Sequence, residues 1–475
     1  MSEKIDYKKL KFKCGIEIHQ QLETHKLFCK CPSLVNDETK PNVFFKRKLR
    51  AVAGETGKID IAAKFEQEKN KEYIYEACTT SSCLVEYDEE PINKINFNAL
   101  KITLEVAKLL NAKIIDYVQF MRKIVVDGSN VSGFQRTALI AVDGYVETSK
   151  GKVGIETICL EEEAAKKIKE KENSVKYKLD RLGVPLIEIA TDPTIKDNEH
   201  AKEVASKIGM ILRSTNKVKR GIGSIRQDIN VSINGKSRVE IKGFQDLKSI
   251  PIVIHNEILR HKKAKKIEPQ VRKAEPDGTT TYLRPMPGAA RMYPESDIKP
   301  IKITKKILSE IKIPELLDEK VLRLEKKLNL NPDLAKEVVK NEINIEKISE
   351  KLSNLEPNYI ASILTAGLKE LKRKHKLNTD KLKEEDYLEV LNYLNEKKVS
   401  KDIVLELFKQ KIKGQKINLS KYETISDENL EKEILKIIKA NPNAPIGGLM
   451  GDIMKKFRGK VEGKKVMTLL KKLTK

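Results

Sequence analysis

FKCGIEIH, residues Phe12–His19, alternates apolar and polar side chains with the two-residue period of a β-strand. Its apolar face is made by Phe12, Cys14, Ile16 and Ile18. Glu17 and His19 then share the other face, about 7 Å apart along the strand. They are either two polar residues on a half-solvated strand or the beginning of a functional site.

A second alternating strand follows much later, at Ile225–Ile233, IRQDINVSI. The turn signal Asn234-Gly235 predicts that it forms a hairpin with the following residues, Arg238–Lys242, RVEIK. The hairpin would present polar side chains on shared faces, namely Arg226, Asp228 and Asn230 on one strand and Arg238, Glu240 and Lys242 on the next. Such oxygen ligands suit Mg²⁺ with phosphates completing its shell. Cross-strand ion pairing is the alternative, and both stay open.

Further acidic residues stand in apolar surroundings. Glu161, Glu162 and Glu163 follow the apolar stretch VGIETICL, where they begin a solvated helix or face cations that offset their repulsion. Glu188 lies inside the apolar strand PLIEIA, so its charge needs a partner or a ligand. The turn-rich segment Asp127–Thr137 is a hairpin loop whose backbone amides could approach an anion.

Four cysteines form two close pairs, Cys29 with Cys31 and Cys78 with Cys83. Four thiolates would satisfy a structural zinc ion. The spacings differ from the usual two-residue kind, however, and buried free cysteines are common, so that reading stays open too. Six cysteines in 475 residues are no disulfide framework, and they favour a reducing, cytoplasmic setting.

The chain is strongly basic, with 93 Lys and Arg against 69 Asp and Glu, a net charge of +24. Half of this excess, +12, falls on residues 301–475, and +7 falls on the last 35 residues. Such charge favours a nucleic-acid partner, although lysine-rich surfaces also occur in thermophiles and in proteins of AT-rich genomes. With 39% hydrophobic residues the chain is not a disordered polyelectrolyte, and no apolar run reaches membrane-spanning length.

The sequence predicts an α+β protein in three parts. Residues 1–300 are rich in β-branched stretches and turns, which indicates a strand-rich domain. Residues 301–414 have helical periodicity, with Asn331-Pro332 as a helix start, and residues 415–475 form a small helical tail domain.

Long motifs resemble one family, that of the archaeal E subunits and the bacterial and organellar B subunits of glutamyl-tRNA(Gln) amidotransferase. They are GIEIHQQLETHKLFCKCPS (Gly15–Ser33), MRKIVVDGSNVSGFQRTALIA (Met121–Ala141), KLDRLGVPLIEIATDP (Lys178–Pro193), PDGTTTYLRPMPGAARMYPESD (Pro276–Asp297) and LMGDIMKKFRGKVEGKKV (Leu449–Val466). The markers are of the archaeal E kind.

This resemblance implies a cradle domain with a kinase-like site, a helical domain and a tRNA-binding tail domain. It implies that ATP and Mg²⁺ activate glutamate misacylated on tRNA(Gln), and that ammonia from an asparaginase-like D subunit then gives Gln-tRNA(Gln). Two alternatives remain: an enzyme that also amidates Asp-tRNA(Asn), and a non-catalytic tRNA-binding scaffold.

The resemblance also implies roles for individual residues. The metal ligands and catalytic residues would be Glu17, His19, Glu162, Asp228 and Glu240, with Glu161 as the neighbouring alternative to Glu162. Glu188 would belong to the substrate or nucleotide site. Weaker candidates for ATP or substrate contacts are Ser132, Gln135, Arg136, Arg181 and Lys242.

One departure from the family is visible. Between His255 and Gly278 there is no room for the aspartyl-tRNA-synthetase-like insertion that the archaeal relatives carry before the TYLRP motif. The sequence also shows no amidase or asparaginase signature, so we expect ammonia to come from a partner protein.

Overall fold

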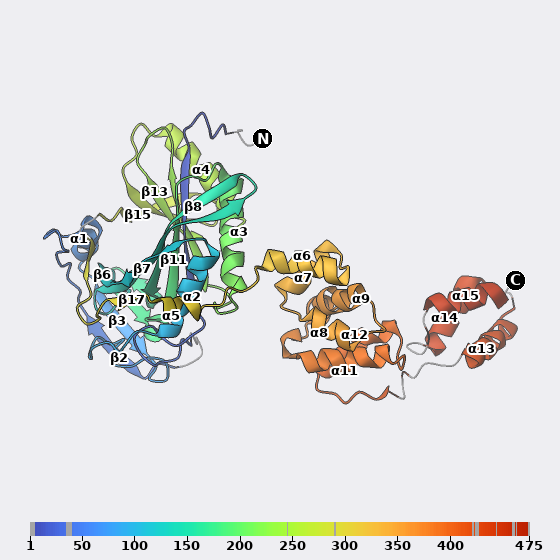
Figure 1. The fold of residues 1–475 in the computed structure, drawn as a ribbon. Helices are drawn as coiled ribbons and strands as arrows, with labels where there is room; N and C mark the ends of the chain where they lie inside the picture. The colour runs from blue at the N-terminus through green and yellow to red at the C-terminus, as the bar shows by residue number, and fades with distance from the viewer. Residues whose placement is uncertain are drawn as a thin grey trace. The chain divides into compact units, whose positions relative to one another are not determined.

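A computed structural model describes residues 5–34, 40–244, 246–288, 291–419, 422, 427–442, 444–457, 461 and 463–473. The chain divides into two compact units, Met1–Leu316 and Leu317–Lys475. The first is strand-rich and the second is helical, which confirms the predicted α+β class (Figure 1). Among the described helices, none has the length and apolar character needed to cross a membrane.

The first unit is built on one large sheet, to which the described residues contribute eleven strands. Ten follow one another in the order β15 (Thr280–Pro285), β14 (Gln270–Ala274), β13 (Val239–Phe244), β12 (Ile225–Ser232), β1 (Lys13–Gln21), β11 (Pro185–Thr191), β8 (Gly151–Glu162), β7 (Phe134–Thr148), β6 (Phe120–Ile124) and β16 (Met292–Pro294). The eleventh, β4 (Lys113–Ile114), pairs with β7. The first strand in the chain is therefore central in the sheet.

Smaller elements complete this unit. A second sheet has the order β2 (Val43–Arg47), β3 (Glu72–Ala77), β10 (Ser174–Lys178) and β9 (Lys166–Lys171). A short pair joins β17 (Ile301–Lys302) to β5 (Tyr117–Val118). The helices are α1 (Ile61–Glu68), α2 (Phe97–Leu109), α3 (Asn198–Ser214), α4 (Ile250–Lys263) and α5 (Lys305–Ser309), with a 3₁₀ turn at Leu179–Arg181.

One face of the large sheet forms the main core. Helices α2, α3 and α4 contact its strands (Figure 1) and pack apolar side chains against them. The apolar face predicted for Phe12–His19 is confirmed, because Cys14, Ile16 and Ile18 of β1 are fully buried in this core. Burial of these side chains orients the opposite face of β1, with Glu17 and His19, away from the helices.

The predicted hairpin is also present. β12 and β13 pair antiparallel, and Asn234 and Gly235 adopt the positive φ values, +51° and +71°, that such a turn requires. The segment from His255 to Gly278 is occupied by the end of α4 and by β14, which pairs with β13 and β15. It thus belongs to the sheet domain and holds no additional domain.

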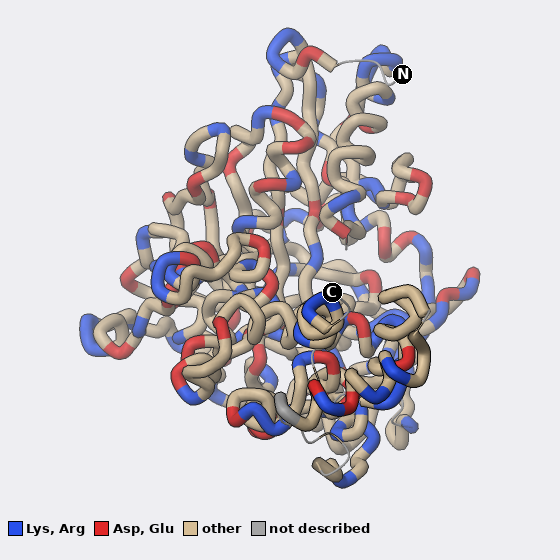
Figure 2. Tube along the Cα trace, turned by 90° about the vertical axis from the view of Figure 1, so that its right-hand side faces the viewer, with Lys and Arg blue, Asp and Glu red and all other residues tan. Residues whose placement is uncertain are grey.

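The regular elements described in the second unit are all helical. It consists of α6 (Leu317–Leu328), α7 (Pro332–Lys340), α8 (Ile345–Lys351), α9 (Pro357–Ser362), a π-helical turn (Ile363–Gly367), α10 (Leu368–His375), α11 (Glu384–Asn395), α12 (Val404–Ile412), α13 (Asp427–Ala440), α14 (Ile446–Lys456) and α15 (Gly463–Leu473), with 3₁₀ turns at Thr379–Lys381 and Lys401–Ile403. The side chain of Asn331 caps α7 as predicted. Helices α6 to α12 share one hydrophobic cluster and α13 to α15 another. Lys and Arg recur along these helices (Figure 2).

Candidate active site

The candidate site lies on the face of the sheet that points away from α2, α3 and α4, which we call the site face. Strand register builds it. Glu17 of β1 lies opposite Asp228 of β12, and His19 lies opposite Glu188 of β11. Because paired residues of neighbouring strands point to the same face, four polar side chains from three strands meet here.

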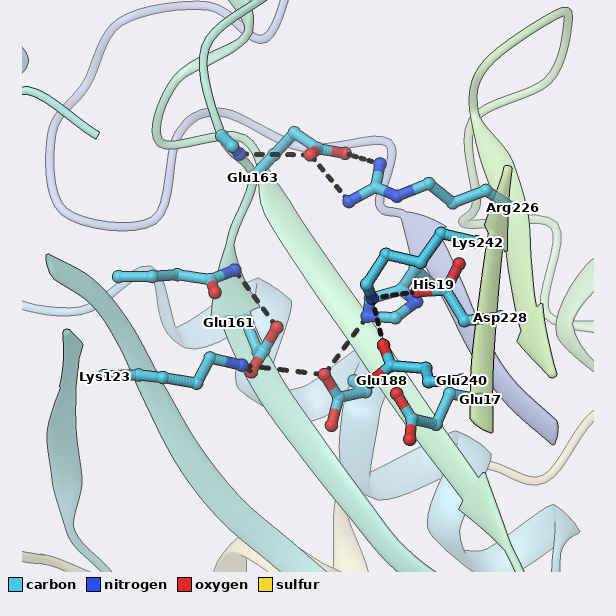
Figure 3. A network of polar contacts seen from close by, with 12 residues as sticks. Glu17, His19, Lys123, Glu161, Glu163, Glu188, Arg226, Asp228, Glu240 and Lys242 are labelled. Atoms are coloured by element: carbon cyan, nitrogen blue, oxygen red, sulfur yellow. Dashed lines mark hydrogen bonds and ion pairs between the residues drawn. The ribbon is translucent and has the colours of Figure 1, made fainter. Parts of the chain in front are cut away.

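The first acidic group contains Glu17, Asp228 and Glu240, each with an oxygen within 4.8 Å of the others (Figure 3). Lys242 lies between two of them, with its Nζ 2.6 Å from Asp228 Oδ2 and in contact with Glu240 Oε1. Asn230 Nδ2 donates to Glu17 Oε1 at 3.0 Å. Two of the three carboxylates therefore share one ammonium group, and the third, Glu17, accepts only from the Asn230 amide in the part of the chain that the structure describes.

This crowding changes the acidity of Glu17. Burial raises the pKa of its carboxyl group to about 7, and the negative charges of Glu240 and Glu188 act in the same direction against the opposing Lys242. The Oδ1 atom of Asn230 is buried without a hydrogen-bond partner among the described residues. Excess negative charge next to an unsatisfied oxygen is the environment that a cation would stabilise.

The second group contains His19, Glu161 and Glu188, whose ligand atoms also lie within 4.8 Å of one another. His19 Nε2 is 3.1 Å from Glu188 Oε2, and Lys123 Nζ is 2.5 Å from Glu161 Oε1 (Figure 3). Gln135 Nε2 donates to Glu161 Oε2 at 3.1 Å. The second ring nitrogen of His19, Nδ1, is buried without a partner among the described residues.

Neighbouring charges set the ionisation of this group. Burial alone would raise the pKa of Glu188, but Lys123 and the bond to His19 outweigh it and hold that pKa well below its usual range. Burial would likewise lower the pKa of His19, but Glu188 and then Asp228 outweigh it and raise that pKa. The group is thus an ionised carboxylate held between a lysine and an imidazole.

The border of the site face is fixed by a charged pair. Arg226 donates to Glu163 through two guanidinium nitrogens, at 2.7 and 2.9 Å, and Gln21 Nε2 donates to the same carboxylate at 3.1 Å (Figure 3). Burial opposes ionisation of Glu163, but Arg226 overcomes it and lowers the pKa to about 2. This pair holds the end of β8 against β12.

Of the two neighbouring candidates, Glu161 and Glu162, the structure brings Glu161 into the site. Consecutive residues of a strand point to opposite faces, so Glu161 enters the site and Glu162 does not. Glu162 instead contacts Arg136 Nη1 at 3.4 Å on the opposite face. The helix start considered for this acidic run is wrong, because β8 extends through Glu162 and Glu163 directly follows it.

The weaker candidates separate in the same way. Lys242 and Gln135 reach the site face through the contacts given above. Ser132 lines a small pocket with Arg136 and Glu162 on the opposite face, and its hydroxyl donates to the Phe134 carbonyl. Arg181 donates to the carbonyls of Ala164 and Ala165 at 2.8 Å, which fixes the chain after β8.

Sequence reasoning missed Lys123, Glu163 and Arg226. Lys123 stands before the apolar residues Ile124–Val126 in a strand, so the argument applied to Glu188, that a buried charge needs a partner, would have found it. Alternation places Arg226 on the correct face of the hairpin but assigns it no role. Its partner, Glu163, is separated from it by 63 positions and only the fold brings the two together.

The cysteine group differs from the predicted set. Cys29, Cys31 and Cys83 lie with Glu86 within 4.8 Å of one another, and Cys78 is not in this group. Glu86 accepts from Cys29 Sγ at 3.0 Å and from the Cys83 amide at 2.8 Å. Burial, and then the charge of Glu86, raises the pKa of the Cys31 thiol to about 11.

Two family models match the chain. The GatB/GatE catalytic domain matches residues 12–309, and a GatB domain matches residues 343–473. Among curated proteins, the chain is 37% identical to the E subunit of glutamyl-tRNA(Gln) amidotransferase from Methanocaldococcus jannaschii, with 98% of the chain and 99% of the relative covered. The corresponding proteins of Archaeoglobus fulgidus and Thermococcus gammatolerans are 36% and 35% identical, with 99% of each chain covered.

The lengths of these alignments also bear on the insertion that the sequence indicated to be absent between His255 and Gly278. The alignment with the M. jannaschii protein extends over 626 positions, whereas the chain has 475 residues, so at least 151 positions of the relative have no counterpart. This difference agrees with the absence of an inserted domain that the sequence indicated.

Proposed function

Because the chain belongs to the GatB/GatE family, we propose that it activates glutamate carried by tRNA(Gln) with ATP and converts it to glutamine with ammonia. The observation that carries this proposal is the meeting of two carboxylate groups, Glu17/Asp228/Glu240 and His19/Glu161/Glu188, on one sheet face. The substrate class comes from the relatives, which are named as E subunits of glutamyl-tRNA(Gln) amidotransferase.

Mg²⁺ fits the first group by the chemistry of its donors. The ion takes oxygen ligands and leaves positions for phosphate and water. Glu17, Asp228 and Glu240 supply carboxylate oxygens, and the unsatisfied Oδ1 of Asn230 lies beside them. We assign the three acidic residues as those that would hold the ion. When bound, Mg²⁺ would supply neutralisation of the phosphates during phosphoryl transfer.

The second group would hold a further divalent cation through His19, Glu161 and Glu188. An imidazole ligand is unusual for Mg²⁺ and suits Mn²⁺ or contact through water. Lys123 fixes the Glu161 carboxylate and lies 3.7 Å from Glu188. Both acidic groups thus keep a lysine that orients the carboxylates in the absence of a substrate.

The reaction itself has two steps. The side-chain carboxylate of the substrate attacks the γ-phosphorus of ATP, and the bond to the β-phosphate oxygen breaks to give an acyl phosphate and ADP. Ammonia then attacks the acyl carbon, phosphate leaves, and the nitrogen loses a proton to give the amide. The chain's contribution is to position the reacting groups and exclude competing water, because both steps depend on orientation.

Ammonia would come from a partner, which we propose to be an asparaginase-like D subunit. Burial raises the pKa of Cys14 and of Cys159, so both thiols stay protonated and are poor nucleophiles. Cys29 and Cys31 lie beside the Glu86 carboxylate, which disfavours a thiolate. These thiols do not resemble the activated nucleophile that hydrolyses an amide donor.

The tail domain, residues 415–475, would bind tRNA through its phosphates. Its last 35 residues carry +7. Basic residues occupy the final turns of α14 and α15, where the negative ends of the helix dipoles also favour cations. Phosphate contacts of this kind are independent of base sequence.

A structural zinc ion would occupy the cysteine group, held by Cys29, Cys31 and Cys83 with Glu86 in place of Cys78. Zinc would keep the thiols deprotonated despite their raised pKa. Elemental analysis of the purified chain should give about one zinc per molecule, lost in Cys31→Ser and kept in Cys14→Ser.

The proposed function is tested with the purified full chain, MgATP, ammonium chloride and either Glu-tRNA(Gln) or Asp-tRNA(Asn). We expect Gln-tRNA(Gln) and ADP in equal amounts from the first substrate. Product from Asp-tRNA(Asn) would support the broader enzyme. Binding of both tRNAs with no ATP turnover would support the scaffold and overturn the enzymatic proposal.

A donor experiment separates the roles of the two proteins. With labelled glutamine or asparagine in place of ammonium, the isolated chain should form no amide product. Release of glutamate or aspartate at enzymatic rates, abolished by a Cys→Ser change, would show that the chain hydrolyses its own donor.

A further inference from the structure

The two ends of the large sheet are joined by a short segment. β15 and β16 are its end strands, and only residues 286–291 connect them in the chain. The Gly288 amide donates to Asp60 Oδ2 at 2.7 Å, and the same buried carboxylate caps α1. The chain that leaves β15 is therefore anchored to α1 at Gly288.

Each end of this segment carries an arginine. On β15, Arg284 pairs with Val271 of β14, which pairs with Glu240 of β13, so Arg284 lies in the same cross-strand row as the first acidic group. Paired residues point to the same face, which places Arg284 on the site face. Two strand spacings separate it from Glu240, about 10 Å.

At the other end, Arg291 directly precedes Met292 of β16, and Met292 pairs with Lys123 of β6. Lys123 is the cation bound to Glu161 in the second acidic group. Arg291 is half-buried, and the charges that act on it include Arg284, Glu161 and Glu240. Strand pairing thus places Arg284 in one row with Glu240 and places Arg291 next to the residue that pairs with Lys123.

These arginines differ from the other cations of the site face. Lys123, Lys242 and Arg226 each form ion pairs with carboxylates of the site. Among the described residues, neither Arg284 nor Arg291 has an ion-pair or hydrogen-bond partner. Burial and the positive charge of Arg284 lower the pKa of Arg291, which shows that its charge is incompletely compensated.

We propose that Arg284 and Arg291 bind the terminal phosphates of the nucleotide. The inference rests on the proposed function, since it takes the anion to be the β- and γ-phosphates of ATP. Two guanidinium groups without carboxylate partners, one next to each acidic group along the strands, are suited to a polyanion that carries oxygens in several directions. The carboxylate groups would bind the metal ions, and the arginines would bind phosphate oxygens that the metal ions leave free.

The inference explains why the arginines come from the segment that joins the sheet ends. Phosphoryl transfer requires positive charges next to the negatively charged phosphoryl group that is transferred. The strands of the sheet centre supply mostly acidic side chains, so further positive charge must come from its edges. The anchor at Asp60 would hold both arginines near the metal groups before ATP binds.

The test is equilibrium binding of ATP, ADP and AMP to the full chain at constant Mg²⁺. Arg291→Gln and Arg284→Gln should each weaken ATP binding by about 10- to 100-fold, the usual effect of losing a charge-assisted hydrogen bond. AMP binding should change by less than about twofold, since AMP lacks the terminal phosphates. Arg291→Lys should keep part of the affinity because it keeps the charge.

A matched control is Lys169→Gln, which removes one positive charge from the exposed strand β9 of the same unit. It should leave ATP binding unchanged. If Arg291→Gln fails to fold, Arg291→Lys and Arg284→Gln decide the question.

Wild-type ATP affinity in both Gln variants, or equal losses for ATP and AMP, would overturn the phosphate assignment and leave the proposed function intact. Absence of ATP binding to the unaltered chain would overturn the proposed function, and the assignment with it. The two failures are therefore distinguishable.

Discussion

On one face of the large sheet Arg136 lies between two carboxylates, Glu162 and Glu295, whereas on the site face a group of three carboxylates has Lys242 paired with only two of them. Arg136 Nε is 2.7 Å from Glu295 Oε2, and Arg122 Nη2 is 2.6 Å from the other oxygen of Glu295. In the first arrangement each of the two buried carboxylates contacts an arginine, and Arg122 also reaches the more exposed Asp297 at 3.6 Å, so that this arrangement is complete without a ligand.

The acidities of Glu295 and Glu17 follow this difference, whereas burial raises the pKa of Glu162 even though Arg136 opposes it. Burial would raise the pKa of Glu295, but Arg122 and then Arg136 lower it, so the carboxylate is stable as an anion. Glu17 on the site face has a pKa raised to about 7. A buried group that satisfies its own charge stabilises the fold, whereas one that does not requires a ligand to complete it.

The largest expected effect is a loss of ATP hydrolysis when a carboxylate of the Glu17/Asp228/Glu240 group is removed. Glu240→Gln and Asp228→Asn should reduce tRNA-dependent ATP hydrolysis by at least about 1,000-fold, because charge neutralisation by the metal dominates phosphoryl transfer. Thermal stability should be kept in Glu240→Gln, since this change relieves repulsion with Glu17. It should fall in Asp228→Asn, because burial opposes ionisation of Asp228 but Lys242 outweighs it and lowers the pKa, so that this carboxylate stabilises the fold. Hydrolysis assays and melting curves test this, with the exposed Glu147→Gln as control. Near-wild-type turnover would contradict the metal assignment.

A change on the face that carries Arg136 should lower the stability of the protein without lowering its ATP affinity. Arg136→Met leaves Glu162 and Glu295 buried with fewer cations, which should lower the free energy of unfolding by about 3–5 kcal/mol. ATP affinity of the folded protein should be unchanged, measured by denaturant unfolding and by nucleotide binding. A selective loss of ATP affinity would instead restore Arg136 as an anion contact.

A second buried carboxylate that is fully paired, Glu257, should make a smaller and pH-dependent contribution to stability. Glu257 of α4 contacts His261 Nε2 at 3.0 Å and Arg260 Nη2 at 2.6 Å, and accepts from Thr280 at 2.8 Å. Burial opposes ionisation, but these bonds, that from His261 first, lower the pKa of Glu257 to about 2. The unfolded value is about 4.3, so the contribution is full above that pH and is lost as the pH falls toward 2.

Glu257→Gln should therefore destabilise the protein by about 2 kcal/mol at pH 7. The difference from the unaltered protein should shrink steadily between pH 5 and pH 2, measured by urea unfolding at each pH. A difference that stays constant over this range would show that the carboxylate charge is not what stabilises α4.

The smallest expected effect is on tRNA binding and comes from the excess positive charge of residues 441–475. Removal of residues 441–475 deletes +7, so binding of tRNA(Gln) should weaken by about tenfold at low salt and its salt dependence should flatten. Titrations at several salt concentrations test this. An unchanged slope would place the tRNA contacts elsewhere in the chain.

Part of this comparison could be predicted from the sequence. Alternation of apolar and polar residues identifies β1 and the β12–β13 hairpin, and it places Glu17, Asp228 and Glu240 on the polar faces of their strands. Their meeting could not be derived from alternation alone, because it depends on which strands become neighbours.

Alternation also fails inside β8. Val153 and Ile155 face the core, and so do Ile158 and Leu160, which means that the inward phase shifts by one residue between the two pairs. The pairing of β8 with β11 slips at this place, where Ile155 lies opposite Thr191. Such a bulge leaves no clear signal in the sequence, and it decides which of the neighbouring glutamates faces the site.

The central place of β1 has a consequence for synthesis on the ribosome. β1 ends at Gln21, but its neighbours β11 and β12 begin only at Pro185 and Ile225. One edge therefore stays unpaired until β11 has emerged and the other until residues up to Ser232 have emerged, and translation at 5–20 residues per second makes the longer interval about 10 to 40 seconds. The nascent chain carries Glu17 and His19 from the start, but it completes the site only when β13 with Glu240 and Lys242 has followed, after about half of the protein has been made.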